Sequence, residues 1–408
     1  MPRCGEFGAK ICCLLVILAG LPATPVPAQE PGDDPEIHAQ ISMAEKLLGK
    51  TPDRGAVLYF LAAGHAQLQE PSEAMNNLKQ CIALKEGFDP SGEPAFAGLK
   101  EGKDFQQLVE QVRKDFPPVS LAKLAYTITE KDLVPEGLAW DPSQDALLLS
   151  SLHRKKIVKI PRQGKITDFV PADRDNLLPV LGIRIDPTDG TIWSNSWVDR
   201  GKTELLHFDK SGALIGRYSL PGDTKHGFND LVVLPDGDVF LTDTAAHQVF
   251  RFNSKTHDFS DVKLCRDLLM PNGIAMTGDG TMIFVADQLG VLQLRVKSGE
   301  CTEVDPGPHN TLAGADGLYL QRGKLIAIQN GIGTPRIAVF QLSQDGSQVT
   351  KTTILEYRSS FTALPTTGAI DGDDFYFIEN SQLGNLNGDK ILDVTKLEPV
   401  RIGKLRIP

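Results

Sequence analysis

Six short segments of this chain share one pattern, and the residue at one position of that pattern changes from segment to segment. Most copies continue with a glycine and an apolar run, as in Pro-Asn272-Gly-Ile-Ala. The residues at the variable position are Glu136, Leu181, Asn229, Asn272, Asp316 and Thr367, at intervals of 43 to 51 residues. Four of them are acids or amides, whose oxygen atoms are the ligands that hard cations such as calcium prefer.

These four residues could form a metal site if the fold brings them together. Calcium takes about six to eight oxygen ligands in irregular geometry, whereas zinc prefers nitrogen or sulfur. Two carboxylates would balance the charge of one divalent ion, and water or substrate oxygens would complete its coordination. We therefore expect Ca²⁺, or another divalent cation, to be bound by Glu136, Asn229, Asn272 and Asp316. A hydrogen-bonded water cluster without a metal is the alternative.

The spacing of the pattern indicates the fold that would bring these side chains together. An interval of about 40 to 50 residues is typical of one four-stranded blade of a β-propeller. Six copies predict an all-β six-bladed propeller over residues 119–408. Because equivalent positions of the blades surround one axis, the four oxygen-bearing residues should converge there, while Leu181 and Thr367 provide no strong ligand.

Strand and turn signals inside each interval agree with this fold. Residues 146–150, 239–242, 282–285 and 375–378 each follow a turn rich in Pro, Gly, Asp or Ser, and we predict that they form the second strands of blades. Residues 123–129 precede the first blade, and residues 399–407 end the last one. We expect these two strands to pair, because closing the ring removes exposed sheet edges.

A small all-α domain is predicted before the propeller, over residues 29–118. Four short helices fit the helical periodicity; Asp34 can cap a helix that begins at Pro35, and Asp104 with Gln107 resembles a capping box. Residues 52–86 resemble one tetratricopeptide unit. A single unit cannot form the concave surface of a repeat array. We therefore favour an accessory domain, with docking of a protein partner as the alternative.

The N-terminus predicts export. Residues 1–28 combine a basic flank, an apolar run at 11–21 and small residues before Gln29, which is the pattern of a signal peptide. The expected location is secreted or periplasmic, with no membrane span after cleavage. A net charge of −10 and a pI of about 5.4 argue against nucleic acid as a partner.

Cleavage would leave three cysteines, Cys81, Cys265 and Cys301. Cys265 and Cys301 fall near the outer edges of different blades, where their separation could exceed the reach of a disulfide. We predict buried free thiols in preference to a disulfide between Cys265 and Cys301.

The propeller region resembles the six-bladed hydrolases of the gluconolactonase and regucalcin family, with diisopropylfluorophosphatase and paraoxonase as more distant relatives. The likeness lies in Pro-Glu136-Gly, Asn229-Asp230-Leu, Pro-Asn272-Gly and Ala-Asp316-Gly. It implies that Glu136, Asn272 and Asp316 are the core calcium ligands and that Asn229 is a fourth ligand or a substrate contact. It also implies Asp316 as general base or nucleophile. Where that family often has an arginine, this chain has His226-Gly227-Phe228.

Further residues could complete a site on the same face of the propeller. His226 is a candidate acid or base, and the candidates for substrate contacts are Asn229, Trp197, Phe228, His153 and His247; the alternative for these histidines and aromatics is ordinary packing. Ser150, Asn195, Asp243, Asp287 and Asn330 follow the variable positions by 14 or 15 residues. We expect most of these five to cap neighbouring backbone groups.

Together these features predict an exported calcium-dependent hydrolase of a small-molecule lactone or ester, in which the metal polarises the carbonyl and Asp316 acts as base or nucleophile. A propeller that binds a ligand or a protein without catalysis is the alternative, because one fold supports many functions.

Overall fold

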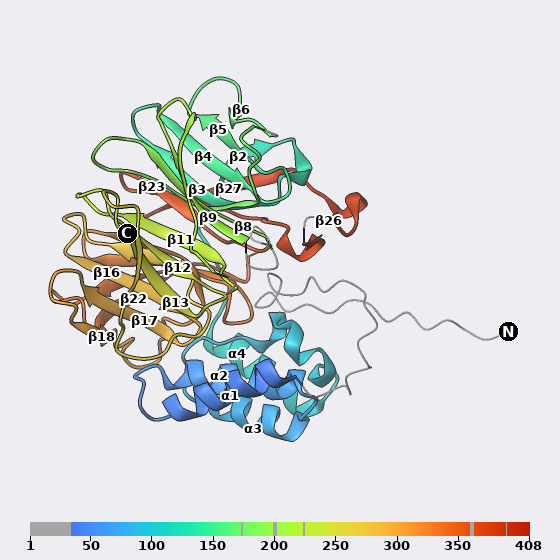
Figure 1. Ribbon diagram of the computed structural model, residues 1–408. Helices are drawn as coiled ribbons and strands as arrows, with labels where there is room; N and C mark the ends of the chain where they lie inside the picture. Colours follow the sequence, from blue (N-terminus) through green and yellow to red (C-terminus); the bar gives the residue numbers. More distant parts are fainter. Residues whose placement is uncertain (1–33, 173, 199–201, 223–224, 360–362, 389) are drawn as a thin grey trace.

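The structure is a computed structural model that describes residues 34–172, 174–198, 202–222, 225–359, 363–388 and 390–408. The predicted signal peptide, residues 1–28, lies outside these ranges. A propeller and a group of helices packed against it make up the described chain (Figure 1). The predicted six-bladed propeller with preceding helices is therefore confirmed. Within the described ranges, no helix has both the length and the apolar composition needed to cross a bilayer.

The helical region contains four α-helices, as predicted. They are α1 (Pro35–Leu47), α2 (Arg54–Gln67), α3 (Pro71–Ala83) and α4 (Lys103–Asp115), with short 3-10 helices at Pro90–Gly92 and Pro94–Leu99. Asp34 caps α1, because its Oδ1 accepts a hydrogen bond from the amide of Glu36. The predicted capping box is wrong. Gly102 precedes α4, and Asp104 lies inside the helix and pairs with Lys79 at 2.6 Å.

Six antiparallel sheets form the blades, each with its first strand at the centre of the propeller. Blade one contains β3 (Pro135–Asp141), β4 (Ala146–Ser151), β5 (Lys156–Pro161) and β6 (Thr167–Val170). Blade two contains β7 (Val180–Ile185), β8 (Ile192–Val198), β9 (Lys202–Phe208) and β10 (Leu214–Tyr218). Blade three contains β11 (Phe228–Val233), β12 (Val239–Asp243), β13 (Gln248–Phe252) and β14 (Phe259–Asp261).

The remaining blades follow the same order, and the last one closes the ring. Blade four contains β15 (Ile274–Met276), β16 (Met282–Asp287), β17 (Gly290–Arg295) and β18 (Cys301–Glu303). Blade five contains β19 (Ala315–Gln321), β20 (Lys324–Gln329), β21 (Arg336–Leu342), β22 (Val349–Tyr357) and the short β1 (Val119–Ser120). Blade six contains β23 (Gly368–Asp371), β24 (Asp374–Ile378), β27 (Val400–Arg406) and β2 (Lys123–Ile128).

The predicted closure is confirmed, because β2 pairs with β27 from Lys123 opposite Lys404 to Ile128 opposite Val400. The core lies between adjacent blades. At the closure, for example, Leu147 and Leu149 of blade one pack with Ile378 and Ile402 of blade six. Burial of these apolar faces stabilises the ring, and the paired first and last strands leave no free edge there.

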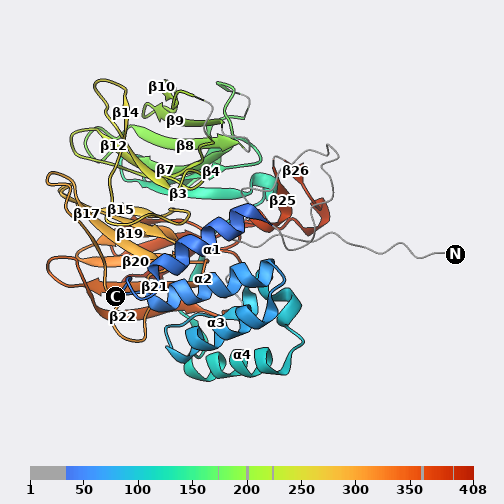
Figure 2. The ribbon, with the colours of Figure 1, turned by 60° about the horizontal axis from the view of Figure 1, so that its bottom comes forward.

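Two additions cover the same side of the propeller (Figure 2). One is the helical region, in which Leu61 packs with Leu269 and Leu289 of blade-four loops. The other is an insertion between β24 and β27, which contains the hairpin of β25 (Leu386–Asn387) and β26 (Lys390–Ile391). Ile391 packs with Val134 and other residues of blades one and two. Both additions therefore cover loops that lead into the innermost strands.

Polar contacts fix the helical region to the propeller. The Asp53 carboxylate caps α2 by accepting from the amide of Ala56, and it also accepts from Thr311 Oγ1 and the amide of Leu312, both at 2.8 Å. Asp89 accepts a hydrogen bond from Tyr357 at 3.0 Å. Asp53 is buried with partners in the connection between β18 and β19, and Asp89 is buried with a partner on β22 of blade five, so the helices and this part of the propeller form a single packed unit.

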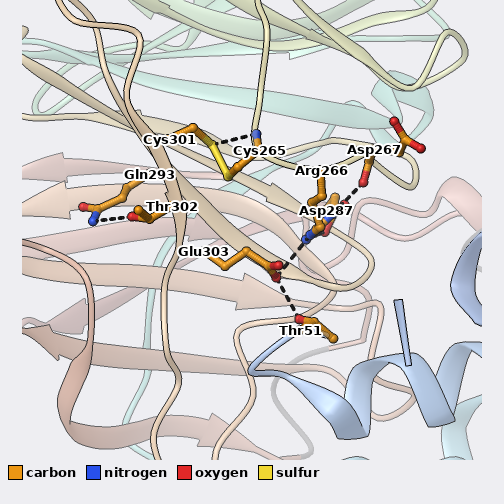
Figure 3. The surroundings of a disulfide bond; sticks show 9 residues. All are labelled: Thr51, Cys265, Arg266, Asp267, Asp287, Gln293, Cys301, Thr302 and Glu303. Carbon is orange, nitrogen blue, oxygen red and sulfur yellow. Dashed lines mark hydrogen bonds and ion pairs between the residues drawn. A yellow bond between two sulfur atoms is a disulfide. The ribbon is translucent and has the colours of Figure 1, made fainter. Parts of the chain in front are cut away.

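A disulfide joins Cys265 to Cys301, with their Cα atoms 5.3 Å apart, so the prediction of free thiols at these positions is wrong (Figure 3). The chain leaving β14 crosses to the next blade and passes the first residue of β18. This crossing brings together two residues that the sequence assigns to different blades. Cys81 is a buried free thiol, as predicted.

Candidate functional site

The variable position of the sequence pattern lies on or just before the innermost strand of each blade. Glu136 is on β3, Asn229 on β11 and Asp316 on β19, while Asn272 immediately precedes the glycine that leads into β15. The innermost strands contact one another in cyclic order around the axis. Blades one, three, four and five therefore bring these four side chains to one end of the axis.

Local backbone geometry turns these residues toward the centre. The pairing of the first two strands shifts register at the variable position in blades one, two, three and five. Such bulges redirect side chains and are common next to functional sites. The glycine that follows also allows close approach: a Cβ on Gly137 would lie 2.2 Å from the carbonyl oxygen of Leu181, and one on Gly182 would lie 2.4 Å from that of Asn229.

Hydrogen bonds orient the amide and acid groups of the site. Asn330 Nδ2 donates to Asp316 Oδ2 at 2.5 Å, and the Asn272 side chain also hydrogen-bonds to Asp316. Asn229 Nδ2 donates to Thr244 Oγ1 at 3.0 Å. Because these amide nitrogens are engaged, the amide oxygens remain as potential ligands.

The carboxyl groups of the site lie in an unfavourable environment for negative charge. Burial, followed by the charges of Asp316 and Asp230, raises the pKa of Glu136 well above its usual value. Burial raises the pKa of Asp316 to about 6, although hydrogen bonds from Asn330 and Asn272 oppose this shift. A buried carboxylate without a counter-charge is costly.

Two oxygen atoms of the site have no partner among the described residues: Glu136 Oε2 and Asn272 Oδ1 are both buried and accept no hydrogen bond there. A divalent cation bound between them would satisfy both oxygens and offset the carboxylate charge. The donor set of two carboxylates and two amide oxygens fits calcium. Across the described ranges, no cluster of three or more His, Cys, Asp and Glu side chains is placed to hold a metal. The candidate site differs from such a cluster because half of its ligands are amides.

An ion pair next to these residues was not predicted from the sequence. Arg184 Nη2 donates to Asp230 Oδ2 at 2.6 Å, and its guanidinium lies 5.2 Å from the ring centre of Tyr319. With Glu136 and Asp316, this gives three carboxylates and one guanidinium, a net charge of −2 when all are ionised. One divalent cation would neutralise that charge. The signal available in the sequence was a charged residue, Arg184, inside an otherwise apolar inner strand.

The axis opens into a cavity on the other side of Arg184. The cavity measures about 240 Å³, and its lining residues come from the innermost strands of all six blades, including Trp140, Arg184 and Tyr319. A second crevice lies between the helices and the loops that lead to the site, lined in part by Phe60, Met270 and Gly331. Its volume of about 30 Å³ is room for roughly one or two waters, so it is too small to hold a substrate.

The two blades without a strong ligand use their variable positions for packing. Leu181 is buried in an apolar cluster with Val134, Leu152 and Trp197, which also contacts the β25–β26 insertion. Thr367 Oγ1 donates to the carbonyl oxygen of Glu136. Trp197 Nε1 is buried without a partner in the described part of the chain. These contacts place the β25–β26 insertion beside the site, and Trp197 packs against the insertion.

His226 and Phe228 lie on blade three. His226 Nδ1 is 2.6 Å from Asp243 Oδ2, and Asp243 also accepts from the amide of Gly227. The His226 ring packs edge-on against Phe250. Phe228 is fully buried in a cluster with Leu231 and Phe250, inside the packing of the blades. The carboxylate of Asp243 therefore orients His226, whereas Phe228 contributes to the core.

His153 and His247 contact loop backbone. His153 Nδ1 is 2.8 Å from the carbonyl oxygen of Asp132. His247 Nδ1 accepts from the amide of Met270 at 3.0 Å, and burial lowers the pKa of its imidazole. A neutral His247 therefore holds the chain two residues before Asn272. These contacts are with backbone and not with the four candidate ligands.

The residues at the ends of the second strands have different roles. Asp243 accepts from the amide of Ala246, and Asp287 accepts from those of Leu269 and Leu289. These two cap loop backbone, as predicted. Asn330 donates both to Asp316 Oδ2 and to the carbonyl oxygen of Pro365. Asn195 is fully buried with neither its Nδ2 nor its Oδ1 paired within the described ranges.

No family model and no curated protein matches the chain. Solved structures similar to it include a gluconolactonase from Xanthomonas campestris, with 17% identity and a TM-score of 0.49 over 71% of this chain and 97% of that one. A virginiamycin B lyase from Staphylococcus aureus has 18% identity and a TM-score of 0.49, and the match covers 70% of this chain and 100% of the lyase. A calcium-binding regucalcin from Agrobacterium tumefaciens has 15% identity and a TM-score of 0.48, and the match covers 70% of this chain and 94% of the regucalcin. The names of these proteins describe different activities, and a shared fold does not assign any of them to this chain.

Proposed function

We propose that this chain is an exported, calcium-dependent hydrolase of a lactone or ester. The observation that carries the proposal is the convergence of two buried acids and two amides at one end of the propeller axis, where Glu136 Oε2 and Asn272 Oδ1 have no partner in the described part of the chain. Such oxygen atoms favour a hard divalent cation. Glu136, Asn229, Asn272 and Asp316 would hold this ion.

The residues of the site have distinct roles in the proposed reaction. A bound calcium ion would supply Lewis-acid polarisation of the substrate carbonyl. Asp316 attacks the carbonyl carbon, or it takes a proton from the water molecule that attacks. Asn330 holds the Asp316 carboxylate through its Nδ2. If Asp316 attacks, the alcohol leaves first and a water molecule then hydrolyses the acyl–aspartate anhydride; if Asp316 acts as the base, the water molecule attacks the substrate directly. Each route consumes one water, breaks the acyl–oxygen bond of the substrate and yields a carboxylic acid and an alcohol, which remain joined when the substrate is a lactone.

Two structural features support the other parts of the proposal. The insertion and the helical region both pack beside the site, so they restrict which substrates reach it. A disulfide such as Cys265–Cys301 is typical of proteins in oxidising compartments, which agrees with export to the periplasm or the medium.

The test is hydrolysis of a panel of lactones and aryl esters by the purified protein, with calcium and with a chelator. We expect activity to require calcium and to fall at least about 100-fold in Asp316→Asn, because the variant loses both a ligand charge and the reacting carboxylate. Asp238→Asn is the matched control, since Asp238 is also a buried acid but is paired with Arg251 on blade three, away from the site. Activity that withstands both chelation and Asp316→Asn would contradict the proposal. Calcium binding without turnover would favour the alternative, a non-catalytic binding propeller.

A further inference from the structure

The segment that leads into Asn272 begins at the disulfide. Cys265 is exposed and bonded to Cys301, and the next residue, Arg266, turns its side chain inward, where it is 5% exposed (Figure 3). Arg266 Nη1 and Nη2 bind the two oxygens of Asp287 at 2.6 and 2.9 Å. This is a bidentate, charge-assisted contact, which fixes geometry more strictly than a single hydrogen bond.

Asp287 transmits this contact to the backbone that carries Asn272. Its carboxylate accepts from the amide of Leu269 at 3.0 Å and from that of Leu289 at 2.9 Å. Leu269 lies three residues before Asn272, and the amide of Asn272 itself donates to the carbonyl oxygen of Ala286, the neighbour of Asp287. The position of Asp287 therefore determines the path of the chain into the candidate ligand.

The same guanidinium also connects to the helical region. Arg266 Nε lies 3.2 Å from Glu303 Oε2, and that oxygen accepts a hydrogen bond from Thr51 Oγ1 at 2.7 Å. Thr51 is in the connection between α1 and α2. Glu303 is on β18, the strand that begins with Cys301. The disulfide thus joins two segments whose side chains Arg266, one residue after Cys265, and Glu303, two residues after Cys301, form an ion pair.

We infer that Arg266 is a positioning residue for the candidate metal ligand Asn272 and that the Cys265–Cys301 disulfide holds Arg266 in place. The inference rests on the proposed function for the role of the metal, but the contacts of the loop do not depend on it. Reduction by a dithiol would convert both sulfurs to thiols while the dithiol becomes a disulfide, a transfer of two electrons and two protons. Because Cys265 is exposed, this reaction is possible in the folded protein.

The test is a double-mutant cycle for calcium affinity, measured by calorimetry on the wild type, Arg266→Met, Asn272→Ala and the double variant. Loss of a residue that orients a metal ligand typically weakens affinity by about 10- to 100-fold. We expect Arg266→Met to weaken binding by about tenfold in the wild type and to have little further effect in Asn272→Ala. An equal loss in both backgrounds would show that Arg266 does not act through Asn272.

Arg251→Met is the matched control. Arg251 binds the buried Asp238 with Nε at 2.8 Å and Nη2 at 2.6 Å, but Asp238 lies in the turn between β11 and β12 and not in a loop of the site. We expect this variant to bind calcium as the wild type does. Arg266→Lys keeps the positive charge but cannot bind both oxygens of Asp287 as the planar guanidinium does. The calcium affinity of this variant should therefore lie between those of the wild type and Arg266→Met. A loss of affinity in Arg251→Met equal to that in Arg266→Met would overturn the inference.

Amide hydrogen exchange tests the positioning role of Arg266 independently of the proposed metal site. The amides of Leu269 and Leu289 should exchange faster in Arg266→Met and after reduction of the disulfide, whether or not calcium is present. Unchanged exchange at both amides would overturn the positioning role. A wild type that binds no calcium, but whose loop responds in this way, would refute the metal site and leave the positioning of the loop by Arg266 intact.

Discussion

Arg184 and Asp230 form an ion pair at the propeller axis, with Nη2 of the guanidinium 2.6 Å from Oδ2 of the carboxylate. They come from the innermost strands of adjacent blades, β7 and β11. Asp230 directly follows Asn229, one of the candidate ligands. The pair therefore does two things: it joins blades two and three, and it places a fixed positive charge near Glu136. Burial acts to lower the pKa of Arg184, but the charge of Asp230 and, to a smaller extent, those of Tyr319 and Glu136 raise it above its usual value.

Replacing Arg184 by methionine should destabilise the calcium-free protein by about 3 to 5 kcal/mol, because Asp230 would remain buried without a counter-charge. Added calcium should recover part of this loss, since binding stabilises the folded state. The measurement is urea unfolding with chelator and with calcium. Arg162→Met is the control, because Arg162 forms exposed ion pairs with Asp145 and Asp371. Equal stability of Arg184→Met and Arg162→Met would contradict this account.

The sequence was sufficient to predict the architecture of the propeller because each blade is a local unit. Short turns separate strands such as β4 and β16 from their neighbours in the chain, and each strand pairs with those neighbours. Even the closure by β2 and β27 followed from a simple requirement, that the ring should have no free edge. Local periodicity and this requirement together specify the fold.

Contacts between distant segments could not be predicted in the same way. Cys265 and Cys301 meet because the chain crosses from one blade to the next, and the sequence gives no separation in space for such a pair. The docking of Asp53 onto Thr311 and Leu312 depends on which face of the helices meets which loops. Arg184 could not be recognised from the repeated pattern, because it lies three residues after Leu181, the variable position of its blade.

The closure of the ring offers a test of packing. Gly403 on β27 pairs with Leu124 of β2 and Phe377 of β24, and an added Cβ would lie 2.5 Å from the Phe377 ring. Gly403→Ala should therefore destabilise the protein by about 1 to 3 kcal/mol through overpacking. Gly384→Ala is the control, because no atom of the described residues lies within 4 Å of a Cβ there. Thermal unfolding distinguishes them, and a Gly403→Ala variant as stable as the wild type would show that the closure can repack.

The helical region should become less stable as the pH rises. Burial, and then the charge of Asp53, raises the pKa of Glu86 from 4.5 to about 8, and burial raises that of Asp53 to about 6. In the unfolded chain both groups titrate near their ordinary values. The folded state therefore binds more protons over the range from about pH 4 to 8, and its stability falls as the pH rises through that range.

Glu86→Gln tests this pH dependence, because it removes the charge while keeping the shape of the side chain. We expect a shallower loss of unfolding free energy between pH 6 and 8 than in the wild type, with Asp53 responsible for the remaining slope below about pH 6. Exposed Glu73 on the adjacent α3 provides the control variant Glu73→Gln. If Glu86→Gln and the wild type show the same slope, the Glu86 carboxylate does not carry the predicted penalty.

Asn330 should act on catalysis through Asp316. Its Nδ2 donates both to Asp316 Oδ2 and to the carbonyl oxygen of Pro365, so it holds in place, relative to blade six, the carboxylate that we propose reacts. Asn330→Ala should lower kcat by about 10- to 100-fold with a smaller change in KM, because misplacement of a reacting group affects the transition state most. Asn310→Ala is the control, since Asn310 is bonded to the carbonyl oxygen of Pro308 in a neighbouring loop. A change confined to KM would instead identify Asn330 as a residue that binds substrate, and Asp316 would then hold its position without it.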